Sequence, residues 1–144
     1  MALSAHDAAA SADRLEQVLK LLRTKVADGQ RATLEAFVLR YFGQVDPEDL
    51  AERESADLYG AAMSHWNFAH RREAGQVRVR AFNPTVAEHG WQSTHTIVEI
   101  VNDDMPFLVD SVTMEVNRHG LTLHLIIHPL VSVARGADGV LGGL

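Results

Sequence analysis

Eight histidines are the first candidates for metal chemistry in this sequence. His124 and His128 fall on one face of an extended run. At about 3.3 Å per residue they lie about 13 Å apart, so one ion cannot join them. His65 and His70 are five positions apart, a spacing that does not share a helical face. The spacing predicts no metal site, and a metal-dependent hydrolase is the least favoured of the functions considered.

Carboxylates gather around a turn near residue 103. Asp103, Asp104 and Asp110 have the side chains for general acid–base catalysis or for a divalent ion. The same positions suit structural roles. Asp104 can cap a following helix, Asp103 favours the turn, and Asp110 complements the helix dipole. We favour the structural roles, so no catalytic residue is predicted here.

Nucleophilic catalysis has little support. The chain has no cysteine, which excludes thiol nucleophiles, disulfides and cysteine-bound metals. Ser93, Ser111 and His95 supply hydroxyls and an imidazole, but no G-x-S-x-G elbow accompanies them. The cluster His89-Gly90-Trp91 suits either stacking on a ligand or a tryptophan that closes the end of a small core. We favour the second interpretation.

The composition is that of an ordinary folded domain, with 47% apolar and 22% charged residues among 144. A net charge of −6 disfavours a nucleic-acid partner, which requires a basic surface. No segment is both long and apolar enough to span a membrane, and the first residues lack the features of a secretory signal. We therefore expect a cytoplasmic protein with no membrane partner.

The elements that would position these side chains begin with helices. Apolar residues recur at helical spacing over 15–26 and again over 34–41. Asp46-Pro47 is a strong helix start, with an N-cap followed by proline in the first turn. The helical pattern continues to about His70, with a break near Ser55.

From Gly75 the apolar period changes from 3.6 to 2. Val77 and Val79 alternate with Arg78 and Arg80, which predicts a half-buried strand with its arginines facing solvent. Residues 85–93 are expected to form an irregular loop.

The last third of the sequence predicts a strand, a helix and another strand. Thr94–Val101 is strongly β-branched, Asp104 to about His119 has helical spacing, and Leu121–Val133 is a long extended apolar run. A strand–helix–strand unit over 94–133 should be a right-handed crossover with parallel strands. A turn at 135–139 then leads into the first residues of a further strand.

Several segments resemble one family. The stretch His89–Pro129 is similar to the N-terminal region of the large NAD-dependent glutamate dehydrogenases of bacteria. Tyr41–Leu50, Asp57–Trp66 and Val77–Pro84 fit the same family, so the resemblance covers roughly residues 35–141. In that family the region is described as the first of several ACT-like domains.

The ACT pattern adds a looser resemblance. Asp104-Met105-Pro106 opening a helix and Gly120 closing it match these regulatory modules, but Phe107 replaces the usual glycine. The implied fold is α+β: N-terminal helices followed by a truncated ACT-like, ferredoxin-like β-α-β sheet layer. We expect a helical segment over 1–74 and an ACT-like domain over 75–144, incomplete at its C-terminus.

Any small-ligand site is expected at the turn before that helix, formed by Asn102, Asp103, Asp104 and Met105. Free backbone N–H groups at the helix start favour the carboxylate of an amino-acid effector, and Asp103 can meet its ammonium group.

The resemblance implies a regulatory or assembly region of an enzyme that converts L-glutamate to 2-oxoglutarate and ammonia. The chain has no G-x-G-x-x-G turn and only two lysines, Lys20 and Lys25, so we expect NAD to bind elsewhere in the parent enzyme. The expected partners are the remainder of the parent polypeptide and further copies in a homo-oligomer. The alternative is a stand-alone ligand-binding or dimerisation module of ACT type, which a stop codon after Leu144 would favour.

Overall fold

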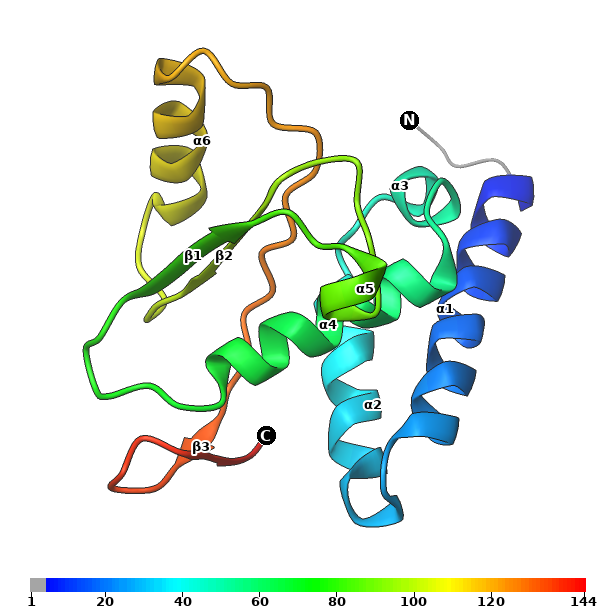
Figure 1. Cartoon of the computed structure of the whole chain (residues 1–144), viewed down its shortest axis with the longest axis horizontal. Helices are drawn as coiled ribbons and strands as arrows, with labels where there is room; N and C mark the ends of the chain where they lie inside the picture. The colour runs from blue at the N-terminus through cyan, green and yellow to red at the C-terminus, as the bar shows by residue number, and fades with distance from the viewer. Residues whose placement is uncertain (1–4) are drawn as a thin grey trace.

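The computed structural model describes residues 5–144, with side chains from residue 12 onward. Four helices occupy the first half: α1 (Ala5–Lys25), α2 (Asp28–Phe42), α3 (Pro47–Ala51) and α4 (Ser55–Ala69). Figure 1 shows α1 and α2 side by side, with α4 crossing beneath the strands. As predicted, the side chain of Asp46 caps α3, and a new helix begins at Ser55.

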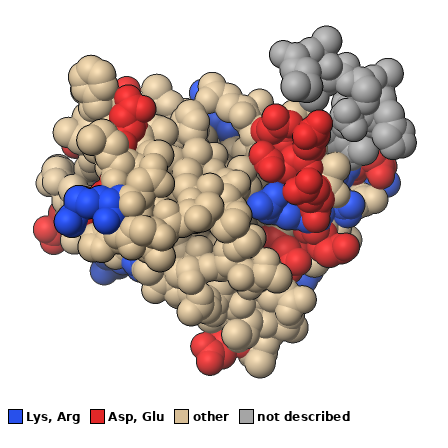
Figure 2. Space-filling view, turned by 90° about the horizontal axis from the view of Figure 1, so that it is seen from above, with Lys and Arg blue, Asp and Glu red and all other residues tan. Residues whose placement is uncertain are grey.

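Charge is unevenly spread over the surface. Figure 2 shows acidic side chains gathered at one end of the face it views, and a broad area without charged side chains across the middle. Within the described residues, no helix is long and apolar enough to cross a membrane.

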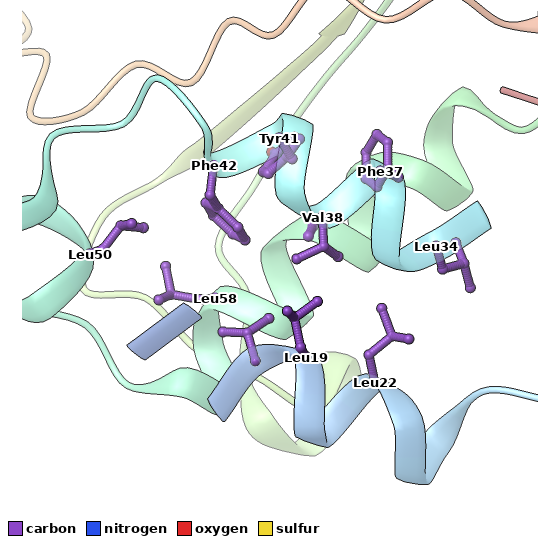
Figure 3. Packing of buried hydrophobic residues seen from close by; sticks show 11 residues of the cluster. Leu19, Leu22, Leu34, Phe37, Val38, Tyr41, Phe42, Leu50 and Leu58 are labelled. Carbon is purple, nitrogen blue, oxygen red and sulfur yellow. The ribbon is translucent and has the colours of Figure 1, made fainter. Parts of the chain in front are cut away.

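The hydrophobic core lies among the four helices. Val18 and Leu22 of α1 and Val38 of α2 are fully buried, and they pack with Leu50 of α3 and Leu58 of α4 (Figure 3). The helical stripes predicted over 15–26 and 34–41 therefore form one shared core. Fully burying a side chain of this size contributes about 1.5–3 kcal/mol, so this cluster is the main source of stability.

Two strands form an antiparallel pair, β1 (Arg78–Phe82) and β2 (Ile97–Val101), with Arg80 opposite Glu99. The prediction of a solvent-facing arginine row holds only in part, because the Arg80 side chain is 43% exposed while both arginines also contact α4. Arg78 and Arg80 face α4, where both guanidinium groups lie over the ring of Phe68. The valines occupy the other face.

That valine face is open: Val77, Val79 and Val98 are 56%, 59% and 54% exposed. Period-2 alternation places arginines and valines on opposite faces but does not decide which face turns inward. Here aromatic rings and a buried carboxylate make the arginine face the favourable one to cover.

The connection between β1 and β2 is not wholly irregular, as 85–93 was expected to be. It contains the short helix α5 (Val86–His89), whose first turn is capped by the side chain of Thr85. Gly90 ends the helix with φ of 78°, a left-handed conformation that glycine adopts without steric penalty.

The helix after β2 is α6 (Leu108–Arg118), and Gly120 follows it in a left-handed conformation, as predicted. Its N-terminus differs from the prediction. Phe107, not Asp104, is the N-cap residue, and no side chain caps the helix. The turn over Pro106 and Phe107 delays the start of the helix past the proline, so Asp104 lies too far upstream to reach its first amides.

The predicted parallel crossover is wrong. Residues 121–133 form no strand, and β2 pairs only with β1 among the described residues. Two partly buried side chains of this segment, Ile127 and Val131, pack on the helical core instead. The carbonyl of Leu130 accepts a hydrogen bond from Arg40 at 3.2 Å. The segment 121–133 is therefore held by side-chain packing on the helices and not by hydrogen bonds to a neighbouring strand.

The chain continues into a second antiparallel pair, β3 (Ala134–Arg135) and β4 (Leu141–Gly143), around the predicted turn. An isolated bridge between Arg71 and Val140 ties this hairpin to the end of α4. Helices and two small antiparallel sheets confirm the α+β class.

Candidate functional site

The loop predicted to bind a ligand, Asn102–Met105, lies between β2 and α6. Arg72, which is buried, donates from Nη2 to Oδ1 of Asp103 at 2.9 Å. The amide of Asn102 donates to the sulfur of Met105 at 3.4 Å. One oxygen of Asp103 is thus already used by a guanidinium group, while the uncapped start of α6 leaves backbone N–H groups for an anion.

A second polar cluster lies between α4 and the β1–β2 pair. Glu99 is 3% exposed, and its carboxylate accepts from Nε of Arg80 and from the hydroxyl of Ser64, the latter at 2.8 Å. Nη2 of Arg80 also donates to Ser64 Oγ at 2.9 Å. A buried carboxylate requires such partners, since an unpaired charge in the interior is strongly unfavourable.

Next to this cluster, His65 bridges α2 and β2. Its Nε2 lies 3.1 Å from the carbonyl oxygen of Ile100, and its Nδ1 lies 3.0 Å from the hydroxyl of Tyr41. A carbonyl can only accept, so Nε2 carries the proton and, in the neutral ring, Nδ1 accepts from Tyr41. Burial, and secondarily the negative charge of Glu99, raise the pKa of Tyr41 well above its ordinary value.

Trp91 is buried, which agrees with the interpretation favoured from the sequence, although it does not belong to the core cluster of the four helices. It is 5% exposed, and its ring meets that of Phe82 edge-on at 6.1 Å between centroids. Gly60 of α4 lies against the indole, where any Cβ would collide with it. His89 remains exposed, with Nδ1 accepting from the backbone N–H of Thr85 at 3.1 Å.

Beside Trp91 lies a cavity of about 360 Å³, which we call the Trp91 groove. It opens between α1, α4, β1 and the α5 segment, and its lining includes Lys25, Tyr59, Met63, Arg80, His89 and Trp91. No sequence pattern indicates this groove, because its walls come from positions far apart in the chain. The cluster His89-Gly90-Trp91 was the only local signal.

The other candidates of the sequence meet only in local or pairwise contacts. The ring of His124 stacks on that of His95 at 4.0 Å between centroids. Ser93 Oγ accepts from the backbone N–H of His95 at 3.1 Å, which is a local turn contact. Asp110 lies in the first turn of α6, the position expected for a dipole-complementing acid. The part of the chain with described side chains holds no group of three or more potential metal ligands.

Comparison with known proteins gives one consistent family. The family model described as glutamate dehydrogenase, ACT1 domain, matches residues 37–144. An NAD-specific glutamate dehydrogenase of Halomonas elongata is 42% identical over 123 residues, which is 85% of this chain and 8% of the relative. One of Pseudomonas aeruginosa is 39% identical over 134 residues, 93% of this chain and 8% of the relative. No solved structure matches the chain.

Proposed function

Since the chain belongs to the glutamate dehydrogenase ACT1 domain family, we propose that it is the N-terminal regulatory or assembly region of an NAD-dependent glutamate dehydrogenase. The match over residues 37–144 carries this proposal. The parent enzyme would convert L-glutamate, NAD⁺ and water to 2-oxoglutarate, ammonia, NADH and a proton. The chain spans about 8% of the length of the relatives it matches.

The region itself is proposed to be non-catalytic. A dinucleotide fold is built on parallel strands joined through helices, with a glycine-rich turn at the first helix. The strand pairs described here are all antiparallel, which supports placing the NAD site elsewhere in the parent enzyme. NAD binding and hydride transfer would then belong to other parts of the parent polypeptide.

An assembly role is supported by the surface that the fold leaves open. Val79 and Val98 lie on the uncovered face of the strand pair, and α6 has an apolar stripe but no fully buried residue. Within the described residues, 122–133 form no backbone–backbone hydrogen bond. Such surfaces suit contact with the remainder of the parent polypeptide or with another copy in a homo-oligomer.

A regulatory role would require an effector, and the loop Asn102–Met105 is the proposed place for an amino acid. The start of α6 offers N–H groups to its carboxylate. Its ammonium group would compete with Arg72 for Asp103.

The experiment is an assay of the purified chain. We expect no NADH formation at 340 nm with glutamate and NAD, and no heat of NAD binding in calorimetry. Turnover by the pure chain, or micromolar affinity for NAD, would contradict the proposal.

A further inference from the structure

Five apolar side chains are exposed where the strand pair continues into α6, and together we call them the hairpin–loop surface. Each is more than half exposed, and the set consists of Val77, Val79, Val98, Met105 and Phe107. We propose that this surface binds a second copy of the chain about a two-fold axis, with the Phe107 ring of each copy packed on the valines of the other. The proposal rests on the assembly role and names the partner and the contact that this role would use.

The valines and the start of α6 share one side of the strand pair. Arg80 and Glu99 point towards α4, where Ser64 contacts both, so the neighbouring Val79 and Val98 point away from it. Figure 1 shows α6 on the side of the strands opposite α4, and Phe107 directly precedes this helix. One copy therefore presents an aromatic side chain and an apolar face to a partner that approaches from this side.

Phe107 has the features of a pre-organised anchor. Among the described residues it is the only non-glycine residue with a positive φ, at 64°, and its ring is mostly exposed. The loop before it is held in place, since Arg72 donates to Asp103 at 2.9 Å. The amide of Asn102 also donates to the sulfur of Met105. An aromatic side chain on a fixed backbone loses little conformational entropy when a partner covers it.

The size of the surface fits a weak dimer of two copies. Five side chains that are each more than half exposed offer several hundred Å² per copy, so two copies approach the total of about 1,000 Å² that a specific interface needs. A two-fold axis uses the same surface on both copies, so the contact between ring and valines forms twice. The anchor and the face that receives it are thus both present on this chain.

The first test is analytical ultracentrifugation of the whole chain, which should show a concentration-dependent dimer. Phe107→Gly removes the ring but tolerates the positive φ, so the fold is kept while the dissociation constant of the dimer rises about tenfold. Leu130→Ala removes an exposed apolar side chain outside the surface and should leave the dissociation constant unchanged. Circular dichroism of both variants verifies that they fold.

Mixing two variants tests the reciprocal contact. Val79→Lys keeps the Phe107 ring and Phe107→Gly keeps the valines, so a mixed dimer retains one of the two contacts. The mixture should therefore contain more dimer than either variant alone at the same total concentration.

A monomeric wild-type chain, equal weakening by Phe107→Gly and Leu130→Ala, or no gain of dimer on mixing would overturn the inference. A wild-type dimer that is unaffected by Phe107→Gly would overturn it too, but would leave the assembly role standing. NADH formation by the chain would contradict the proposed function and not this contact, so the two failures are distinguishable.

Discussion

Arg80 and Glu99 lie directly opposite each other in the antiparallel pair of β1 and β2, and Nε of Arg80 donates to the Glu99 carboxylate. The pair sits on the face of the strands that α4 covers, where Ser64 reaches both side chains. This arrangement explains why the arginines lie on the α4 side of the strand pair, with Glu99 buried beneath a partly exposed Arg80, while the valines lie on the other side. An ion pair in the ladder, with a hydroxyl completing its hydrogen bonds, orients the whole hairpin.

Replacing the buried acid should therefore destabilise the fold. Glu99→Gln keeps the volume but removes the charge that Arg80 requires. We expect the free energy of unfolding to fall by about 1–3 kcal/mol, since the solvent-accessible guanidinium group can recover part of its hydration. Urea unfolding followed by circular dichroism measures it. The matched control is Glu115→Gln on α6, which breaks an exposed pair with Arg118 and should leave the midpoint unchanged. Equal stability of Glu99→Gln and the wild type would show that the pair does not orient the hairpin.

Burial of the Tyr41 hydroxyl makes the stability of the fold depend on pH in the alkaline range. Burial raises the pKa of Tyr41 in the folded state, so the unfolded chain loses this proton first. Stability is then complete below about pH 10 and falls above it by about 1.4 kcal/mol per pH unit for each such tyrosine. Tyr41→Phe should flatten this decline, although it costs about 1–2 kcal/mol near neutrality because Nδ1 of His65 loses its donor. Thermal melts from pH 7 to 11.5 test both effects, and a decline of unchanged slope in the variant would contradict the assignment.

Gly60 is required because Trp91 packs on α4. Alanine normally favours a helix over glycine, by about 0.8–1 kcal/mol. At Gly60 its Cβ would collide with the indole, so Gly60→Ala should lower stability by about 1–3 kcal/mol and shift tryptophan emission to the red. Gly29→Ala is the control, because that Cβ would meet nothing within 4 Å. If both variants behave alike, Trp91 does not pack on Gly60 of α4.

Phe107 stores backbone strain before α6. Its φ is 64° while its side chain is 75% exposed, so little packing offsets the left-handed conformation. Phe107→Gly and Phe107→Ala both remove the ring, but only glycine relieves the strain. The glycine variant should be more stable than the alanine variant by about 1 kcal/mol in chemical denaturation. The reverse order would indicate that Phe107 does not hold this conformation in solution.

Local patterns predicted the helices well and the sheet poorly. The apolar residues around Val18 and Leu22 recur every 3.6 residues. A helix with such a stripe is stable only when the stripe is buried, so the pattern predicts both the helix and its buried face. Alternation over Val77–Arg80 divides the side chains between two faces but does not say which face is covered. That choice depends on partners from other elements, such as Phe68 of α4, which sequence spacing does not reveal. The run 121–133 has the composition of a strand, but a ladder requires a second strand at the right place, and packing on the helices took precedence.

The site followed the same rule. The burial of Trp91 could be predicted from its own neighbourhood in the sequence. Ser64 and Glu99 meet across 35 positions, and Lys25 and Arg80 line one groove from opposite halves of the chain. These contacts depend on the tertiary fold, so no local sequence motif could predict them.

The open valine face predicts self-association of the isolated chain. Val79 on β1 and Val98 on β2 are each more than half exposed, on a pair of strands whose outer edges are unpaired within the described residues. Folded monomers seldom leave such a surface to water, because contiguous apolar patches above a few hundred Å² favour association. Unpaired strand edges add main-chain donors and acceptors to the same contact.

Light scattering over a concentration series should therefore show a mean mass that rises with concentration. Val79→Lys places a charge in the middle of the valine face and should return the chain towards a monomer. Val86→Lys makes the same substitution at an exposed valine of α5, off the hairpin face, and should associate as the wild type does, because the two variants share one net charge. Equal loss of association in both would assign the effect to overall charge repulsion. A monodisperse wild-type chain at every concentration would show instead that α6 and the segment 121–133 already shield the face in solution.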